Sequence, residues 1–188
     1  MNILPQDTPN PSTKQLLLDR SILDEHQEPV EFVKGTETQA SPLASVLLEN
    51  ANIEAVFLGH NFVSITKTTN AQWEEVLPTS MMIVQNHLLT QQPVLSTTTH
   101  LQDAPVQHNP EDAEIVAQIQ ELLDTRVRPA VAQDGGDITF FGFDKGVVYL
   151  KMKGACAGCP SSTMTLKMGI ENLLRHYIPE VGAVQQVI

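Results

Sequence analysis

Two cysteines three positions apart are the residues best suited to chemistry in this chain of 188 residues. Cys156 and Cys159 lie in the run GACAGCPSS and are the chain's two cysteines. A secreted protein stabilised by disulfides would carry more cysteines at wider spacing. A close pair in a reducing compartment indicates a metal site or a redox dithiol instead. Both kinds of site use thiolate sulfur, so both depend on how the chain folds around the pair.

The residues around the pair favour the thiolate form. Pro160 is typical of the first position of a helix, which places Cys159 at the N-cap. The free N–H groups and the positive dipole end of that helix then point toward the sulfur atoms. Gly154 and Gly158 allow a tight loop that brings backbone amides close to sulfur. The two sulfur atoms can therefore face one metal centre.

Two thiolates are too few for a complete site, since tetrahedral zinc and iron–sulfur clusters generally take four protein ligands. His176 follows Cys159 by 17 residues, which is about 25 Å along a continuous helix and too far for a third ligand. The other histidines lie in the N-terminal part or in the linker, without ligand spacing: His26, His60, His87, His100 and His108. The simplest completion is a second copy of the chain, related by a twofold axis, which brings the sulfur ligands to four.

Two other interpretations use the same cysteines, a thiol–disulfide oxidoreductase and a dimeric zinc-binding structural protein. A strand that leads into a CxxC pair and then a helix is superficially like a thioredoxin-type site. The elements expected before Cys156, however, run helix–strand–strand. The position directly before that cysteine is not aromatic. A purely structural pair of buried thiols is disfavoured by the Gly and Ser residues around it.

The elements that would position the pair are expected over residues 110–188. A helix begins at Pro110, has Arg126 and Arg128 in its last turn and is ended by Pro129, because a proline restricts the residue before it. The run DGGD, residues 134–137, is expected to be a turn, with shielding of a bound cluster as the less favoured alternative. Two strands, a helix and a last strand follow, over residues 138–143, 147–153, 160–177 and 183–188. Gly146 would take the positive φ of the hairpin.

Residues 1–92 predict a separate unit with strands over residues 13–19, 30–33, 53–58 and 62–67. Ser41-Pro42 has the pattern of an N-cap followed by proline at the first helical position. Another helix starts near Ala71, although Pro78 complicates its first turns. Residues 93–109 have no Lys or Arg and no apolar period, which is typical of a linker. The predicted fold class is thus α+β, with two small two-layer α+β domains, 1–92 and 110–188, joined by a flexible linker, 93–109.

Composition excludes several classes of function. The net charge of −11 disfavours binding to nucleic acid or to anionic membranes. No apolar run approaches the length of a membrane span. The first residues are acidic rather than Arg-rich, so the expected location is the cytoplasm. No Ser/His/Asp arrangement, phosphate loop or pair of carboxylates suited to acid–base chemistry is evident, so we expect a protein that is not an enzyme.

Several segments resemble the NifU-like (Nfu) family of iron–sulfur cluster scaffolds. EIVAQIQELLDTRVRPAVAQDGGDI and GVVYLKMKGACAGCPSSTMTLKMGIENLL resemble the family's C-terminal domain. TPNPSTK at 8–14, SPLASVL at 41–47 and the strand–hairpin–Trp73 region resemble its N-terminal domain. Cys156 and Cys159 match the cluster ligands.

The resemblance implies a carrier that holds a [4Fe–4S] cluster between the CxxC motifs of two subunits, with [2Fe–2S] as the other cluster type. Upstream cluster-assembly proteins would supply the cluster, and apo iron–sulfur proteins would receive it. The loaded protein would be a homodimer with no nucleic-acid or membrane partner.

Overall fold

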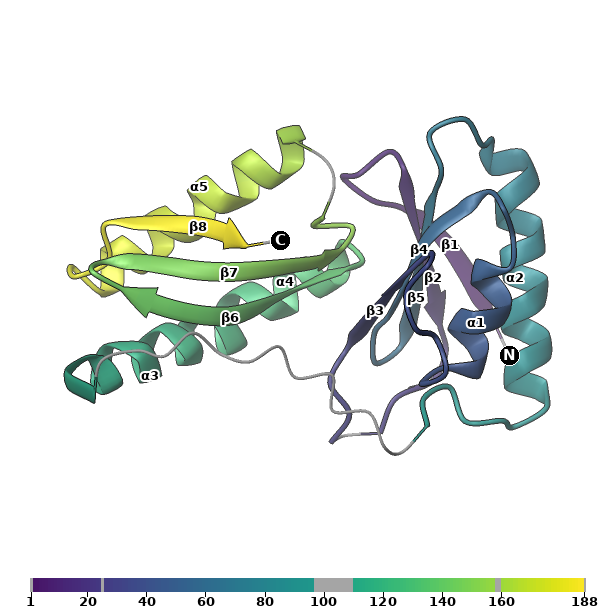
Figure 1. The fold of residues 1–188 in the computed structure, drawn as a ribbon, viewed down its shortest axis with the longest axis horizontal. Coiled ribbons are helices and arrows are strands. Elements are labelled where there is room, and N and C mark those ends of the chain that lie inside the picture. Colours follow the sequence, from purple (N-terminus) through teal and green to yellow (C-terminus); the bar gives the residue numbers. More distant parts are fainter. Residues whose placement is uncertain (1, 25, 97–109, 158–159, 188) are drawn as a thin grey trace. The chain divides into compact units, whose positions relative to one another are not determined.

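The computed structural model describes residues 2–24, 26–96, 110–157 and 160–187, and the side chains of 160–162 are not part of that description. The chain forms two compact units, Met1–His100 and Leu101–Ile188 (Figure 1). Each unit is a β-sheet with helices on one of its faces, so the expected α+β fold class is confirmed.

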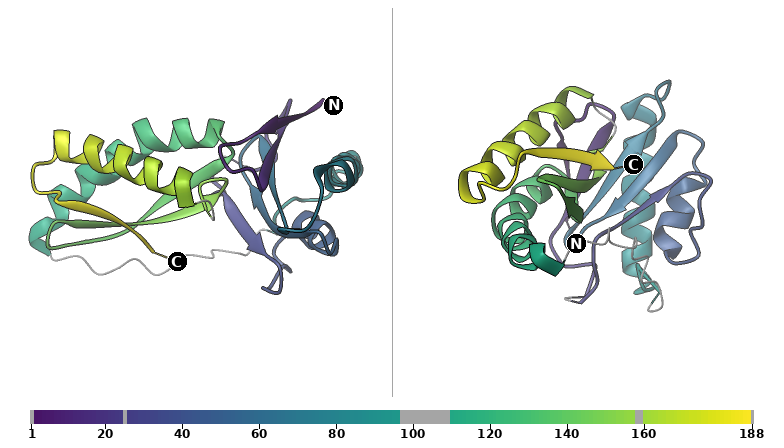
Figure 2. Two further views of the ribbon diagram at one scale, coloured as in Figure 1. Left: turned by 90° about the horizontal axis from the view of Figure 1, so that it is seen from above. Right: turned by 60° about the vertical axis from the view of Figure 1, so that its left-hand side comes forward.

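The first unit is built on a five-stranded antiparallel sheet with the strand order β1-β2-β5-β4-β3. Its strands are β1 (Ile3–Asp7), β2 (Thr13–Leu18), β3 (Val30–Val33), β4 (Ile53–Leu58) and β5 (Phe62–Lys67). Helices α1 (Pro42–Leu48) and α2 (Trp73–Leu89) cover the same face of this sheet (Figure 2). Apolar side chains of β4, β5 and α1 form the centre of the buried core between the two layers.

Ser41 begins α1 as the sequence predicts, because its side chain accepts a hydrogen bond from the N–H of Ala44 at 3.0 Å. The same hydroxyl donates to the carbonyl of Val94 at 2.7 Å, and Val94 is buried in the core of the unit. The N–H of Ser96 donates to the carbonyl of Ala40 at 2.8 Å. Residues 94–96 of the expected linker therefore pack with the first unit, whereas 97–109 lie outside the described residues.

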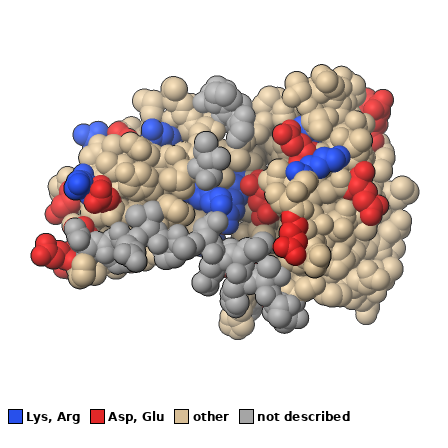
Figure 3. Space-filling model, in the orientation of Figure 1, with Lys and Arg blue, Asp and Glu red and all other residues tan. Residues whose placement is uncertain are grey.

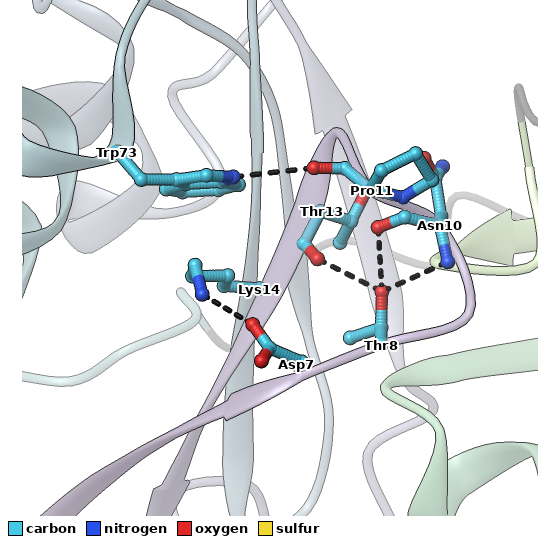
Figure 4. A network of polar contacts seen from close by, with 7 residues as sticks. All are labelled: Asp7, Thr8, Asn10, Pro11, Thr13, Lys14 and Trp73. Atoms are coloured by element: carbon cyan, nitrogen blue, oxygen red, sulfur yellow. Dashed lines mark hydrogen bonds and ion pairs between the residues drawn. The ribbon is translucent and has the colours of Figure 1, made fainter.

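Side chains from three elements hold the TPNPSTK segment between β1 and β2 (Figure 4). The Thr8 hydroxyl lies 2.9 Å from the carbonyl of Asn10 and 2.8 Å from that of Thr13. On α2, the indole N–H of Trp73 donates to the carbonyl of Pro11 at 3.2 Å. Lys14 pairs with the Asp7 carboxylate, and its Nζ lies 5.5 Å from the centroid of the Trp73 ring. These contacts fix the segment on the surface of the first unit.

The second unit has a three-stranded sheet with the order β6-β7-β8. Strands β6 (Gly136–Asp144) and β7 (Val147–Gly154) form an antiparallel hairpin, in which Gly146 has a φ of 81° as expected. Helix α5 (Pro160–Tyr177) returns the chain to β8 (Ala183–Val187), which pairs parallel with β7. Alternate residues of β7 are buried under α3 (Ala113–Leu122) and α5, which cover one face of the sheet (Figure 2).

The helix that begins this unit does not end at Pro129, in contrast to the expectation. A 3₁₀ turn, Pro110–Asp112, leads into α3, and a π-helical turn, η2 (Leu123–Val127), leads on to α4 (Arg128–Gln133). Pro129 is the second residue of α4 and directly follows the π-helical turn and Arg128. The chain therefore remains helical past the proline, up to Gln133.

Acidic side chains outnumber basic ones on the first unit. Residues 1–92 carry eleven acidic and four basic side chains, and acidic groups are spread over the face of this unit that Figure 3 shows. Among the described residues, no helix combines the length and the apolar character that crossing a membrane requires.

Candidate functional site

Cys156 lies just beyond the end of β7 and just before α5. Gly154 ends the strand with a φ of 62°, and its carbonyl accepts from the N–H of Ala157 at 3.0 Å, which closes a tight turn around the cysteine. The hydroxyl of Thr163 on α5 donates to the carbonyl of Cys156 at 3.1 Å. Cys156 is 6% exposed and belongs to the core of the second unit. Its backbone is therefore held by both the strand and the helix.

The backbone at the start of β6 lies directly against the sulfur atom, and Gly135 and Gly136 are called the glycine wall below. A Cβ atom on Gly136 would lie 2.5 Å from the Sγ of Cys156 and 2.9 Å from the backbone N of the same residue. Gly135, with a φ of 79°, accepts from the N–H of Ala155 at 3.1 Å. Because these distances leave no room for a methyl group, the thiol lies directly against the peptide backbone of the DGGD run.

An ion pair between Arg128 and Asp137 connects helix α4 to the strand residue that follows the glycine wall. The guanidinium of Arg128 donates through Nε to Oδ1 of Asp137 at 2.9 Å and through a terminal nitrogen to Oδ2 at 3.0 Å. A second terminal nitrogen donates to Asp124 at 3.2 Å. The Asp137 side chain is 7% exposed and that of Arg128 is 28% exposed, so this is a largely buried, two-pronged contact.

Cys159, the other expected ligand, lies outside the described residues together with Gly158. That the two sulfur atoms face one metal centre stays a prediction. Within the described ranges, no three His, Cys, Asp or Glu side chains gather in a way that could hold a metal ion. His176 lies in the last turn of α5, at the end of the helix away from the cysteines.

Sequence patterns predicted neither the contact between Gly136 and Cys156 nor the ion pair of Arg128 and Asp137. The DGGD run was expected to be a turn, whereas Gly136 and Asp137 are the first residues of β6. The signal in the sequence for these contacts was the pair of adjacent glycines followed by Asp137. Local spacing does not show that Gly136 contacts Cys156 or that Asp137 contacts Arg128.

Two family models match the chain, one for each unit. The model described as "Scaffold protein Nfu/NifU N terminal" matches residues 3–91, and the model described as "NifU-like domain" matches residues 119–185. The second match includes both cysteines and the DGGD run.

Curated relatives match the whole chain. A protein of Drosophila ananassae named "NFU1 iron-sulfur cluster scaffold homolog, mitochondrial" is 41% identical over 187 residues, which cover 100% of this chain and 64% of the relative. A protein of the same name from Drosophila erecta is 42% identical over the same length, with 65% of the relative covered. The chain thus spans just under two thirds of the length of these relatives.

Among solved structures, that of a NifU-like protein from Saccharomyces cerevisiae covers 52% of this chain and 86% of its own, with a TM-score of 0.47 and 19% sequence identity. The fold class rests on the strands and helices described above rather than on this likeness.

The names of the relatives contradict the expected cytoplasmic location, because they place those proteins in mitochondria. The acidic residues near Met1, on which the expectation rested, do not decide the compartment.

Proposed function

Because the chain belongs to the Nfu/NifU family of iron–sulfur cluster scaffold proteins, we propose that it carries a cluster on Cys156 and Cys159 and delivers it to apo-proteins. The observation that supports this most directly is the position of Cys156, which stands at the start of the CxxC run, between the end of a strand and the first turn of α5. We expect the dipole and the free N–H groups at the start of α5, which begins at Pro160, to favour the thiolate form of the pair.

The proposed cargo is a [4Fe–4S] cluster shared by two copies of the chain. Such a cluster takes four protein ligands, and each copy offers two cysteines. Because the chain has two cysteines, a second copy related by a twofold axis is the simplest source of the other two thiolates.

Delivery would proceed by ligand exchange rather than by turnover chemistry. A recipient thiolate replaces one cysteine sulfur at iron, and the released thiolate either takes up a proton or binds again. A ligand set divided between two chains is easier to dismantle than one enclosed in a single core. The protein is accordingly proposed to be a carrier and not an enzyme, as the scaffold names of its relatives suggest.

The fold does not support the alternative function, a thiol–disulfide oxidoreductase. The elements before Cys156 run α4, β6, β7, and the two strands form an antiparallel hairpin. A thioredoxin-type site instead follows a strand–helix–strand unit. For the location, we propose mitochondria, by analogy with the named relatives.

An anaerobic reconstitution tests the proposal. The full chain is incubated with iron and sulfide, purified, and analysed for iron, sulfide, zinc and visible absorption. Sedimentation before and after loading reports the oligomeric state. We expect about four iron and four sulfide per two chains, and a shift from monomer to dimer on loading. Two iron per dimer would instead assign a [2Fe–2S] cluster. A protein that holds zinc alone, or that cycles a disulfide without taking up iron, would contradict the carrier function.

A further inference from the structure

A continuous series of contacts connects an ion pair on α4 to the sulfur of Cys156. Arg128 binds both carboxylate oxygens of Asp137, and Asp137 directly follows Gly136 at the start of β6. Gly136 in turn lies against the sulfur so closely that a Cβ atom would come within 2.5 Å of it.

We infer that Arg128 and Asp137 form a positioning pair, which holds the Gly135–Gly136 backbone against Cys156 and so sets the direction in which this thiolate faces a cluster. The inference rests on the proposed function in that it treats Cys156 as a ligand. Neither Arg128 nor Asp137 contacts the cluster in this account, and both act through the backbone of β6.

The backbone at this point needs an external support. Gly135 and Gly136 have no side chains with which to pack, and glycine loses more conformational freedom on folding than any other residue. Across the hairpin, Gly136 pairs with another glycine, Gly154. The backbone beside the sulfur therefore consists of glycine, and Asp137 directly follows it on β6.

The ion pair has the geometry of such an anchor. Two parallel N–H···O contacts fix the orientation of the carboxylate as well as its distance. The contact of Arg128 with Asp124 ties the guanidinium to η2, so it bridges the π-helical turn and the first residues of β6. A buried ion pair adds little net stability compared with an apolar pair, and a role in fixing conformation explains its presence better.

The inference is tested in the full chain with Arg128→Ala and Asp137→Asn, and with Arg128→Lys as the conservative variant. Arg175→Ala is the matched control, because Arg175 forms an exposed i,i+4 pair with Glu171 in the same unit. The first measurement is the rate at which iodoacetamide modifies Cys156 in the apo protein, resolved from Cys159 by peptide mass spectrometry. The second is the loss of the cluster to an iron chelator, together with the visible circular dichroism of the loaded protein.

We expect Arg128→Ala and Asp137→Asn to raise the modification rate of Cys156 about tenfold, since charge-assisted hydrogen bonds restrain local opening. Both variants should also lose the cluster several times faster and change its visible circular dichroism, while Arg128→Lys lies between them and the parent. Arg175→Ala should match the parent in each measurement.

Far-ultraviolet circular dichroism and the melting temperature identify the variants that are folded. If Arg128→Ala does not fold, Arg128→Lys decides, because lysine keeps the charge but loses the two-pronged contact. Modification and chelation rates within a factor of about two of the parent in a folded variant would overturn the inference. If the parent itself takes up no cluster, the proposed function fails, yet the modification of Cys156 in the apo protein still tests the positioning pair.

Discussion

Gly136 and Cys156 are 20 positions apart in the sequence, and a methyl group added to Gly136 would lie 2.5 Å from the cysteine sulfur. The same methyl group would lie 2.9 Å from the backbone N of Cys156 and from the carbonyl oxygen of Lys153. A sulfur atom can rotate away, but the two backbone atoms belong to the hairpin and its turn. The site therefore depends on the absence of a side chain at position 136.

Gly136→Ala should consequently lower the stability of the second unit by about 2 kcal/mol through overpacking. It should also reduce the iron bound per chain, because the Cys156 loop must shift to relieve the contacts. Thermal unfolding and iron analysis after reconstitution measure the two effects. Gly169→Ala is the matched control, since a Cβ atom at this position in α5 meets nothing within 4 Å. That control should stabilise the helix by up to about 1 kcal/mol and leave iron binding unchanged. Equal iron content in the two variants would contradict the steric argument.

Cys156→Ser and Cys159→Ser should each abolish stable binding of the cluster while the chain stays folded. A hydroxyl group is a far poorer ligand for iron than a thiolate, and no three His, Cys, Asp or Glu side chains of the described residues gather to form another metal site. Iron and sulfide analysis after anaerobic reconstitution measures the loss, and circular dichroism verifies the fold. A normal iron content in either variant would show that the ligands have been misassigned.

Ser41→Ala should destabilise the first unit without affecting the cluster. The Ser41 hydroxyl caps α1 and also donates to the carbonyl of Val94. The loss of an N-cap costs about 1 kcal/mol, and a buried carbonyl left without its donor adds a cost of similar size. We expect a lower melting temperature for fragment 1–96 and parental iron binding in the full chain. Unchanged melting would mean that another group replaces the hydroxyl.

Fragment 110–188 should fold and bind the cluster without the rest of the chain. The apolar core of the second unit comes from its own strands and helices, and both cysteines lie within it. Transfer to an apo recipient, followed with an iron chelator present, should be slower than from the full chain if the first unit selects recipients. Equal transfer rates would remove that role from the first unit. A folded fragment that takes up no iron would require a ligand from elsewhere in the chain.

Local patterns in the sequence determined most of the elements. Strands 30–33, 53–58 and 62–67 and helix 160–177 agree with the structure at both ends. Ser41-Pro42 marked the start of α1 correctly, and Gly146 marked the hairpin. Each of these signals depends on residues that are neighbours in the sequence, namely an N-cap, a turn glycine or an apolar period. The CxxC pair was visible for the same reason.

Other elements became visible only in the tertiary structure. Strand β1 was not predicted, because it is an edge strand that contains Pro5 and is mostly exposed, so it shows no apolar alternation. The π-helical turn before Pro129 could not be read from the sequence, since proline by itself predicts the end of a helix. Strand β1 is stabilised by pairing with the next strand, β2, and the pattern of its own residues does not show this pairing.

The sequence by itself determined which residues we propose as ligands, because the types and spacing of Cys156 and Cys159 are local properties of the chain. Only the tertiary structure decided what surrounds the Cys156 sulfur. The β6–β7 pairing brings Gly136 against the sulfur. The packing of α4 against β6 brings Arg128 to Asp137, the residue after Gly136. Contacts between segments that are distant in the sequence form only when the sheet and its helices assemble. Local motifs and the spacing of apolar residues therefore do not predict them.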